Sequence, residues 1–194
     1  MKKTQGQEAN HSGRSLERDV ENEFAARDVP VLWHSISRNN LDMFAERQLI
    51  KRVPQRNWFS GYSHSEFVYH GPAGLAVRIE CKWQEHAGSV DEKAPAMKEN
   101  ALLAPEPVVW LILGGPGMRI GIRRYLHKQC VDYALSGEKL IRFLMPEDVR
   151  RAIKQLVEQD DPGSPLLDAP YQPPYRRLGR RRPSGITFPA GSLL

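Results

Sequence analysis

Two side chains of opposite charge stand two residues apart in residues 75–82, which read Leu-Ala-Val-Arg-Ile-Glu-Cys-Lys. Apolar and polar residues alternate in this segment, and successive side chains of a β-strand point to opposite faces. The alternation predicts a strand whose polar face carries Arg78, Glu80 and Lys82. Its other face is apolar and buried, and consists of Leu75, Val77, Ile79 and Cys81. A Glu-x-Lys pair on a strand is most often a solvated ion pair, so the surrounding residues decide whether it forms a site.

A second carboxylate, Glu66, belongs to residues 65–70, which also alternate. The Gly-Pro-Ala-Gly that follows is typical of a turn, so the pattern predicts a β-hairpin with Glu66 beside Glu80 near its open end. Two carboxylates and a backbone carbonyl form an oxygen-rich site of the kind that Mg²⁺ prefers. Lys82 adds positive charge, which suits a phosphodiester transition state because that state gathers negative charge.

The hydrophobic pattern also predicts the elements that position these side chains. Three apolar residues recur at every fourth position and predict an amphipathic helix over residues 15–28: Leu16, Val20 and Phe24. On that helix Glu17 and Glu21 lie one turn apart, and either could supply a third carboxylate. The remaining elements are, in order, a strand at 29–33, loop or mixed structure at 35–60 with a helical turn near 41–50, a buried strand at 108–113, a helix at 118–134, a strand at 139–145 and a helix at 146–159.

Composition and charge limit the class of protein. The chain has 194 residues, 28 Lys+Arg against 23 Asp+Glu, and a formal net charge of +5. Its 40% hydrophobic and 26% charged residues are close to the globular average, which excludes wholesale disorder. The longest apolar run is far shorter than the roughly 18–20 residues that cross a membrane. With two cysteines and no secretory signal, we expect a reduced, cytoplasmic protein, and its mild basicity permits an anionic partner such as nucleic acid.

Three regions differ in composition. We expect a flexible N-terminus at 1–12, one domain at 13–159 and a Pro/Arg-rich disordered tail at 160–194, which holds seven of the fifteen prolines. The tail contains a basic cluster made of Arg176, Arg177, Arg180, Arg181 and Arg182. Arginine contacts to phosphates are independent of base sequence, so this cluster fits DNA binding, and a solubilising role fits it equally well.

The spacing of the charged residues resembles the D-x(n)-(D/E)-x-K signature of the PD-(D/E)XK nuclease superfamily, since Glu66 is followed after thirteen residues by Glu80-Cys-Lys82. Residues 79–84 and 88–93 resemble the ECKWQ and GSxDEK stretches of a phage-encoded, restriction-endonuclease-like branch. Residues 13–17 are similar to the G-x-x-x-E opening of many of these folds. The resemblance covers about residues 12–145 and implies an α/β fold with an αβββαβ core, in which helices flank a mixed central sheet.

The resemblance also implies roles for individual residues. Glu66 and Glu80 would bind Mg²⁺, for which Mn²⁺ can substitute, together with the backbone carbonyl of Cys81. Lys82 would orient or deprotonate the attacking water or stabilise the pentacovalent phosphate, and Glu17 would hold or orient the metal. Two further contacts are less specific: Gln84 either touches the scissile phosphate or hydrated metal or makes a hydrogen bond of purely structural value, and Lys93, Arg78 and the tail arginines would contact DNA.

One departure from the signature leaves the function open, because its first acidic residue is usually Asp and here is Glu66. The extra methylene moves the carboxylate outward, which fits either a tolerated variant or reduced activity. The leading interpretation is a Mg²⁺-dependent deoxyribonuclease. The alternatives are a structure-selective nuclease like a Holliday-junction resolvase, acting as a homodimer, and a DNA-binding protein with a degenerate catalytic site. The pattern does not distinguish duplex, single-stranded, branched DNA or RNA.

Three other patterns have two interpretations each. The glycine-rich residues 114–117 follow the buried strand, but they lack the Lys-Ser/Thr of a phosphate-binding loop and indicate a turn. Residues 89–92 fit a capping box, yet Pro95 is unfavourable inside a helix that starts there, so the helix can instead begin at Ala94. An aromatic cluster lies beside basic residues and could stack on bases, although we favour core packing for it: Trp58, Phe59 and Tyr62.

Overall fold

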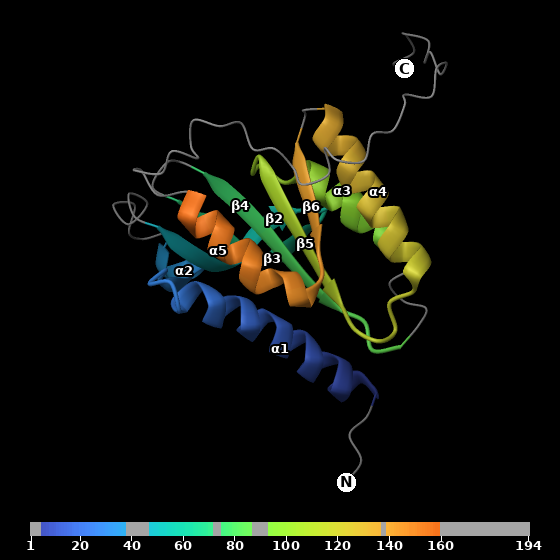
Figure 1. The fold of residues 1–194 in the computed structure, drawn as a ribbon, viewed down its shortest axis with the longest axis horizontal. Helices are drawn as coiled ribbons and strands as arrows, with labels where there is room; N and C mark the ends of the chain where they lie inside the picture. The colour runs from blue at the N-terminus through green and yellow to red at the C-terminus, as the bar shows by residue number, and fades with distance from the viewer. Residues whose placement is uncertain (1–4, 38–46, 72–74, 87–92, 137–138, 160–194) are drawn as a thin grey trace.

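The computed structural model describes residues 5–37, 47–71, 75–86, 93–136 and 139–159. Within these ranges the chain forms helices and strands, with the second, third and fourth strands following one another directly (Figure 1). In chain order they are α1 (Gln5–Ala25), β1 (Val31–Trp33), α2 (His34–Ser37), β2 (Gln48–Arg56), β3 (Tyr62–His70), β4 (Ala76–Trp83), α3 (Ala94–Leu103), β5 (Val108–Gly114), α4 (Ile120–Ser136), β6 (Leu140–Leu144), a 3-10 turn (Pro146–Asp148) and α5 (Val149–Gln159). The tail at 160–194 and its arginines lie outside the described residues.

The strands form one six-stranded sheet in the order β1 to β6. Strand β3 is antiparallel to both of its neighbours, β2 and β4, whereas β1 pairs with β2, β4 with β5 and β5 with β6 in parallel. Helix α3 connects β4 to β5 and α4 connects β5 to β6, as parallel neighbours require. The sheet is therefore mixed and flanked by helices, which confirms the predicted α/β, restriction-endonuclease-like fold.

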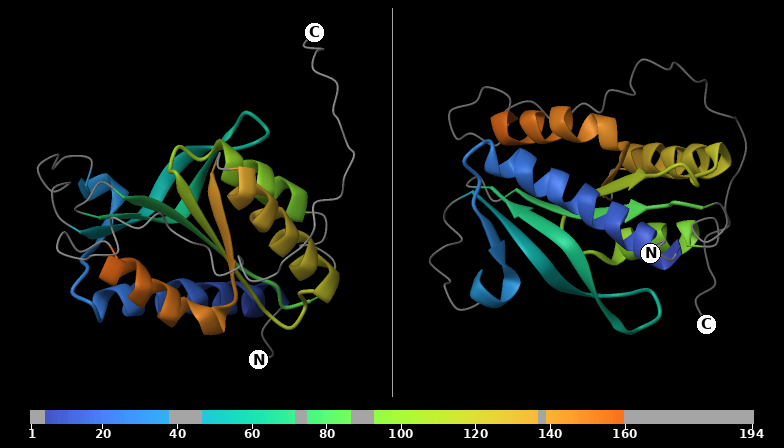
Figure 2. Two further views of the ribbon diagram at one scale, coloured as in Figure 1. Left: turned by 45° about the horizontal axis from the view of Figure 1, so that its top comes forward. Right: turned by 90° about the horizontal axis from the view of Figure 1, so that it is seen from below.

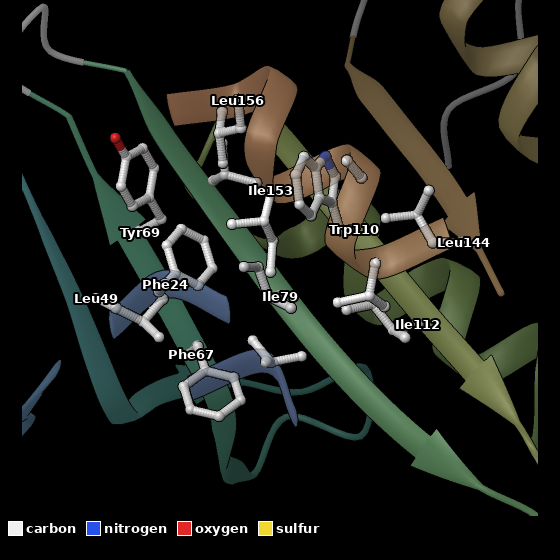
Figure 3. Close-up of a cluster of buried hydrophobic side chains, with 14 of the residues drawn as sticks. Phe24, Leu49, Phe67, Tyr69, Ile79, Trp110, Ile112, Leu144, Ile153 and Leu156 are labelled. Carbon is white, nitrogen blue, oxygen red and sulfur yellow. The ribbon is translucent and has the colours of Figure 1, made fainter. Parts of the chain in front are cut away.

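One face of the sheet is covered by α1 and α5, which run next to each other (Figures 1 and 2). The predicted apolar stripe of α1 is confirmed, because its three residues are fully or almost fully buried. They pack with α5 and with the side chains of the central strands (Figure 3). The labelled members of this cluster are Phe24, Leu49, Phe67, Tyr69, Ile79, Trp110, Ile112, Leu144, Ile153 and Leu156. The opposite face is covered by α3 and α4, which pack on alternate residues of β5 and β6.

Two predictions about secondary structure are wrong. Residues 48–56, expected to be loop or mixed structure, form strand β2, which pairs with β3 on both sides of Arg52. Helix α1 begins at Gln5, ten residues before the expected start, so it includes most of the segment that we assigned to a frayed N-terminus. Helix α3 begins at Ala94 with Pro95 in its first turn, as expected from the position of that proline.

The glycine-rich turn after β5 holds the end of β4 by backbone contact. Gln84 donates its N–H to the carbonyl of Gly114 at 2.8 Å and accepts a hydrogen bond from the N–H of Gly117 at 2.9 Å. Gly115 has a φ of +108°, and a Cβ on it would lie 2.1 Å from the carbonyl oxygen of Gln84. Glycine is therefore required where the turn lies against β4, and the motif is a structural turn beside the site.

Candidate active site

The predicted hairpin opens where the acidic residues lie. The paired positions of β3 and β4 run from His70 and Ala76 to Phe67 and Ile79. Beyond Ile79, β4 continues beside β5 as far as Trp83. The pairing of β3 with β4 thus stops at Phe67 and Ile79, and the two strands separate there. Glu66, which precedes Phe67 in β3, lies in the space where they separate.

Glu66 fills this space and replaces a strand contact. Its Oε2 accepts a hydrogen bond from the backbone N–H of Cys81 at 3.2 Å. The carboxylate thus takes the place of a backbone partner from β3, which has separated from β4 at this point. Its Oε1 lies 2.6 Å from Nζ of Lys82, whose ammonium is also 3.7 Å from Oε2 of Glu80. The structure therefore brings Glu66, Glu80 and Lys82 together, with one cation between two carboxylates.

Exposure differs sharply within this group. The carboxylate side chains of Glu66 and Glu80 are 9% and 14% exposed, whereas the side chain of Lys82 is 42% exposed. The carboxyl groups consequently lie deeper in the site than the side chain of Lys82, part of which reaches solvent on the side from which an anion would approach.

Burial and like charge act on the ionisation of these groups. Desolvation, and then the neighbouring charge of Glu66, raise the pKa of Glu80 to about 8, against an opposing effect of Lys82. Burial alone would lower the pKa of Lys82, but the carboxylates of Glu66 and Glu80 outweigh it and raise that pKa. Lys82 is thus held as a cation, and Glu80 holds a proton at neutral pH when no other cation is bound.

Glu17 approaches the same group from α1. Burial and the charge of Glu66 raise the pKa of Glu17, while Lys82 and Arg52 oppose that shift. The predicted third carboxylate therefore lies within the electrostatic reach of the site. Glu21, the alternative, is instead engaged by Lys51 of β2 at 2.5 Å.

The donors fit a divalent cation of the Mg²⁺ type. Within the described ranges no three His, Cys, Asp or Glu side chains form a metal-binding group. Mg²⁺ does not need such a group, because it keeps several waters and binds through one or two carboxylates. Glu66 and Glu80, with the carbonyl of Cys81, could provide these oxygens, and their mutual repulsion is what a cation would relieve.

A hydrogen-bonded chain supports Glu80 from behind. Gln55 of β2 donates from Nε2 to Oε1 of Glu80 at 3.2 Å and accepts from Nη1 of Arg78 at 2.9 Å. Arg78 in turn forms a two-point ion pair with Glu106, at 2.5 and 2.7 Å. The amide of Gln55 has a carboxylate at one end and a guanidinium at the other, which fixes its orientation.

The position of Arg78 corrects our prediction that it contacts DNA. The residue is 2% exposed and its guanidinium is engaged by Glu106 and Gln55. The alternation correctly predicts that Arg78 lies on the polar face of β4, but this part of the face is buried. Gln55 and Glu106 were missed by the sequence analysis; the signal that could have revealed them is an arginine among valines and isoleucines, since a buried guanidinium requires an acidic partner.

The other predicted residues occupy different surroundings. Gln84 is 4% exposed and its side-chain amide donates to the carbonyl of His86, which fits the structural alternative that we gave it. Lys93 is exposed at the residue before α3. The capping-box residues 89–92 and the tail arginines lie outside the described residues, so their roles stay predictions.

The mixed sheet and its flanking helices define an α/β protein with a restriction-endonuclease-like fold. A family model for the PD-(D/E)XK nuclease superfamily domain matches residues 8–151. The chain therefore belongs to the PD-(D/E)XK nuclease superfamily, whose members are phosphodiester hydrolases acting on nucleic acids. No curated protein and no solved structure matches the chain. Among the described helices, none has the length and apolar character needed to cross a membrane.

Replacing Glu80 by glutamine is expected to stabilise the metal-free protein, and more so at high pH. The folded pKa of Glu80 is about 8 against an ordinary 4.5, so the stability linked to its proton is present below about pH 4.5 and is lost as the pH rises through 8. Glu80→Gln removes that loss. We expect Glu80→Gln to raise the free energy of unfolding by roughly 1–3 kcal/mol at pH 9 and by much less at pH 5, measured by urea unfolding with EDTA.

The matched control for this comparison is Glu158→Gln, because Glu158 is an exposed glutamate on α5. It should leave the unfolding free energy unchanged within about 0.5 kcal/mol at both pH values. A Glu80→Gln protein that is no more stable than the wild type at pH 9 would contradict the idea that Glu80 is a strained carboxylate.

Proposed function

We propose that this protein is a Mg²⁺-dependent deoxyribonuclease that hydrolyses phosphodiester bonds at the group formed by Glu66, Glu80 and Lys82. The observation that carries the proposal is the placement of one ammonium within 2.6 and 3.7 Å of two buried carboxylates, where β3 and β4 diverge. Membership of the nuclease superfamily supports the reaction class, and the metal, the DNA substrate and the residues are the proposed part.

Each residue has a task that follows from its position. Glu66 and Glu80 would hold the divalent cation together with the carbonyl of Cys81, and Glu17 would adjust the charge around it. The cation, when bound, would polarise the phosphate and lower the pKa of a water molecule. Lys82, freed from the carboxylates, would direct its ammonium to the phosphate oxygens or hold the attacking water.

The negative charge of the carboxylates explains why a cation is needed. A phosphodiester that approaches the site meets the negative charge of Glu66 and, once Glu80 ionises, a second one, against the single positive charge of Lys82. We therefore expect activity to depend on a divalent cation, with Mn²⁺ able to replace Mg²⁺.

The test is a cleavage assay on plasmid, single-stranded and four-way-junction DNA with Mg²⁺, Mn²⁺ or EDTA. Cleavage is expected with either metal and is expected to be absent in EDTA and in Glu80→Ala. Glu158→Ala serves as the matched control and should cleave like the wild type, because Glu158 is exposed on α5. Cleavage that persists in EDTA, or in Glu80→Ala, would refute the proposed site.

A second function rests on the departure at position 66. If no substrate is cut while DNA is still bound, the protein is a DNA-binding member of the superfamily in which Glu66 marks a degenerate site. Substitution of Glu66 by Asp distinguishes the two, because restoring the usual residue should raise cleavage in a weakened enzyme and leave a binding protein inactive.

A further inference from the structure

The turn between β2 and β3 presents three exposed aromatic side chains. Trp58, Phe59 and Tyr62 are 52%, 77% and 75% exposed, so our expectation that they pack in the core is wrong. Trp58 and Phe59 meet edge to face, with ring centroids 6.2 Å apart. In the right-hand view of Figure 2 this turn projects from the edge of the molecule. Several large aromatic side chains exposed on one turn are a candidate binding surface.

The turn is held in shape by its own hydrogen bonds. Oδ1 of Asn57 accepts from the N–H groups of Phe59 at 3.1 Å and Gly61 at 2.9 Å. The N–H of Trp58 donates to Oδ1 of Asn100 on α3 at 2.7 Å, which ties the turn to the body of the domain. Hydrogen bonds thus hold the backbone that carries the aromatic rings, so a ligand that stacks on them has less of the turn to order on binding.

Positive charge accompanies the aromatic rings. Arg52 and Arg56 of β2 are exposed, and Arg56 is the cross-strand neighbour of Tyr62. Exposed arginine beside exposed aromatic rings is the combination that holds unpaired nucleic acid, because cations bind the backbone while the bases stack. An acidic protein partner would use the arginines but would have no need for several exposed planar rings.

The aromatic turn and the proposed active site share strand β3. Strand β3 carries Tyr62 at one end of the segment and Glu66 four residues later. Four residues of a strand span about 13 Å, a distance that a few nucleotides of one DNA strand can cover. Arg52 acts electrostatically on Glu17, so the positive charge of β2 also reaches the site. A strand of DNA whose bases rest on the turn can therefore place a phosphate at Lys82.

We propose that the aromatic turn, formed by Trp58, Phe59 and Tyr62, binds unpaired bases of the DNA substrate next to the cleaved bond. This inference rests on the proposed function and names its substrate class. It predicts that the enzyme prefers DNA with unpaired nucleotides, such as single strands, flaps or forks, over blunt duplex.

The test measures binding separately from cleavage, by fluorescence anisotropy of a labelled 20-nucleotide single strand and of the matching duplex in EDTA. Phe59→Ala and Trp58→Ala are each expected to weaken single-strand binding by about 5- to 100-fold, with duplex binding changed less than about twofold. Arg56→Ala should weaken both and reduce the dependence on salt. The control is Ile120→Ala on α4, a large exposed apolar residue away from the turn.

The outcomes separate this inference from the proposed function. Equal losses on single strand and duplex, or no loss on either, would overturn the inference even if the wild type cleaves DNA. A selective loss on the single strand would support it even if no metal yields cleavage, in which case only the proposed function fails. Wild-type cleavage of blunt duplex and fork at equal rates would also count against the turn as a substrate-selecting surface.

Discussion

Replacing Lys82 by alanine is expected to lower the rate of DNA cleavage by about 10²- to 10⁴-fold while metal binding is retained. The side chain of Lys82 is the most exposed of the three, whereas those of Glu66 and Glu80 lie deeper in the site. Removing it takes away charge stabilisation of the phosphate without removing a metal ligand. It also removes a cation that competes for the two carboxylates, so binding of Mn²⁺ should be unchanged or tighter.

The measurement combines single-turnover cleavage with calorimetric titration of Mn²⁺ in the absence of DNA. Glu80→Ala provides the contrast, because it should lose both cleavage and metal affinity. Lys154→Ala is the matched control, since its side chain is 63% exposed on α5 and its ion pair with Glu158 is a surface pair. Lys82→Arg should restore only part of the rate, because a planar guanidinium cannot reproduce a compact ammonium between two carboxylates.

A Lys82→Ala protein that cleaves within tenfold of the wild type would show that another group stabilises the phosphate. Loss of Mn²⁺ binding together with cleavage would show instead that Lys82 holds the carboxylates in position. Either result would exclude the role that we assign to its charge.

The central hairpin was predictable because its pattern is local. Alternation in residues 75–82 specifies which side chains are buried, and Val77, Ile79 and Cys81 do form the covered face. The spacing of Glu66 and Glu80 across one turn brings the carboxylates to the same part of the sheet. The divergence of the strands after Phe67, which opens the site, leaves no local signal in the sequence.

Strand β2 was missed for a reason that the pairing makes clear. Its residues Leu49, Ile50 and Lys51 pair with β1, while Pro54 lies in the part that faces β3 alone. Beyond Lys51 the strand is an edge, where proline and exposed charges are tolerated. Sequence patterns of low hydrophobicity that contain proline usually indicate a loop, so only the tertiary pairing identifies this segment as a strand.

The aromatic turn was mispredicted because its residues look like core residues. Residue type alone favours burial for Trp58, Phe59 and Tyr62, because aromatic side chains bury large apolar areas in most cores. Their exposure depends on the hairpin that carries them past the edge of the sheet, which no local pattern encodes. The placement of Gln55 behind Glu80 has the same origin, since it requires the register of β2 on β3.

The buried ion pair behind the site leads to the second large expected effect. Arg78→Met is expected to destabilise the domain by about 3–5 kcal/mol, because it leaves the buried carboxylate of Glu106 without its cation. Urea unfolding measures this loss. The double variant Arg78→Met/Glu106→Leu should recover most of the stability, since an apolar pair of similar volume carries no unpaired charge.

The same double variant tests whether Arg78 matters beyond stability. Its guanidinium holds the carbonyl of the Gln55 amide, and the amide nitrogen holds Glu80. The double variant should therefore fold stably yet require about tenfold more Mg²⁺ for half-maximal cleavage, as should Gln55→Ala, whose unfolding free energy should fall by only about 1 kcal/mol. Lys154→Met on α5 is the matched control and should change neither quantity. A stable double variant with wild-type metal dependence would mean that Arg78 and Glu106 support only the fold, and that Glu80 is positioned without them.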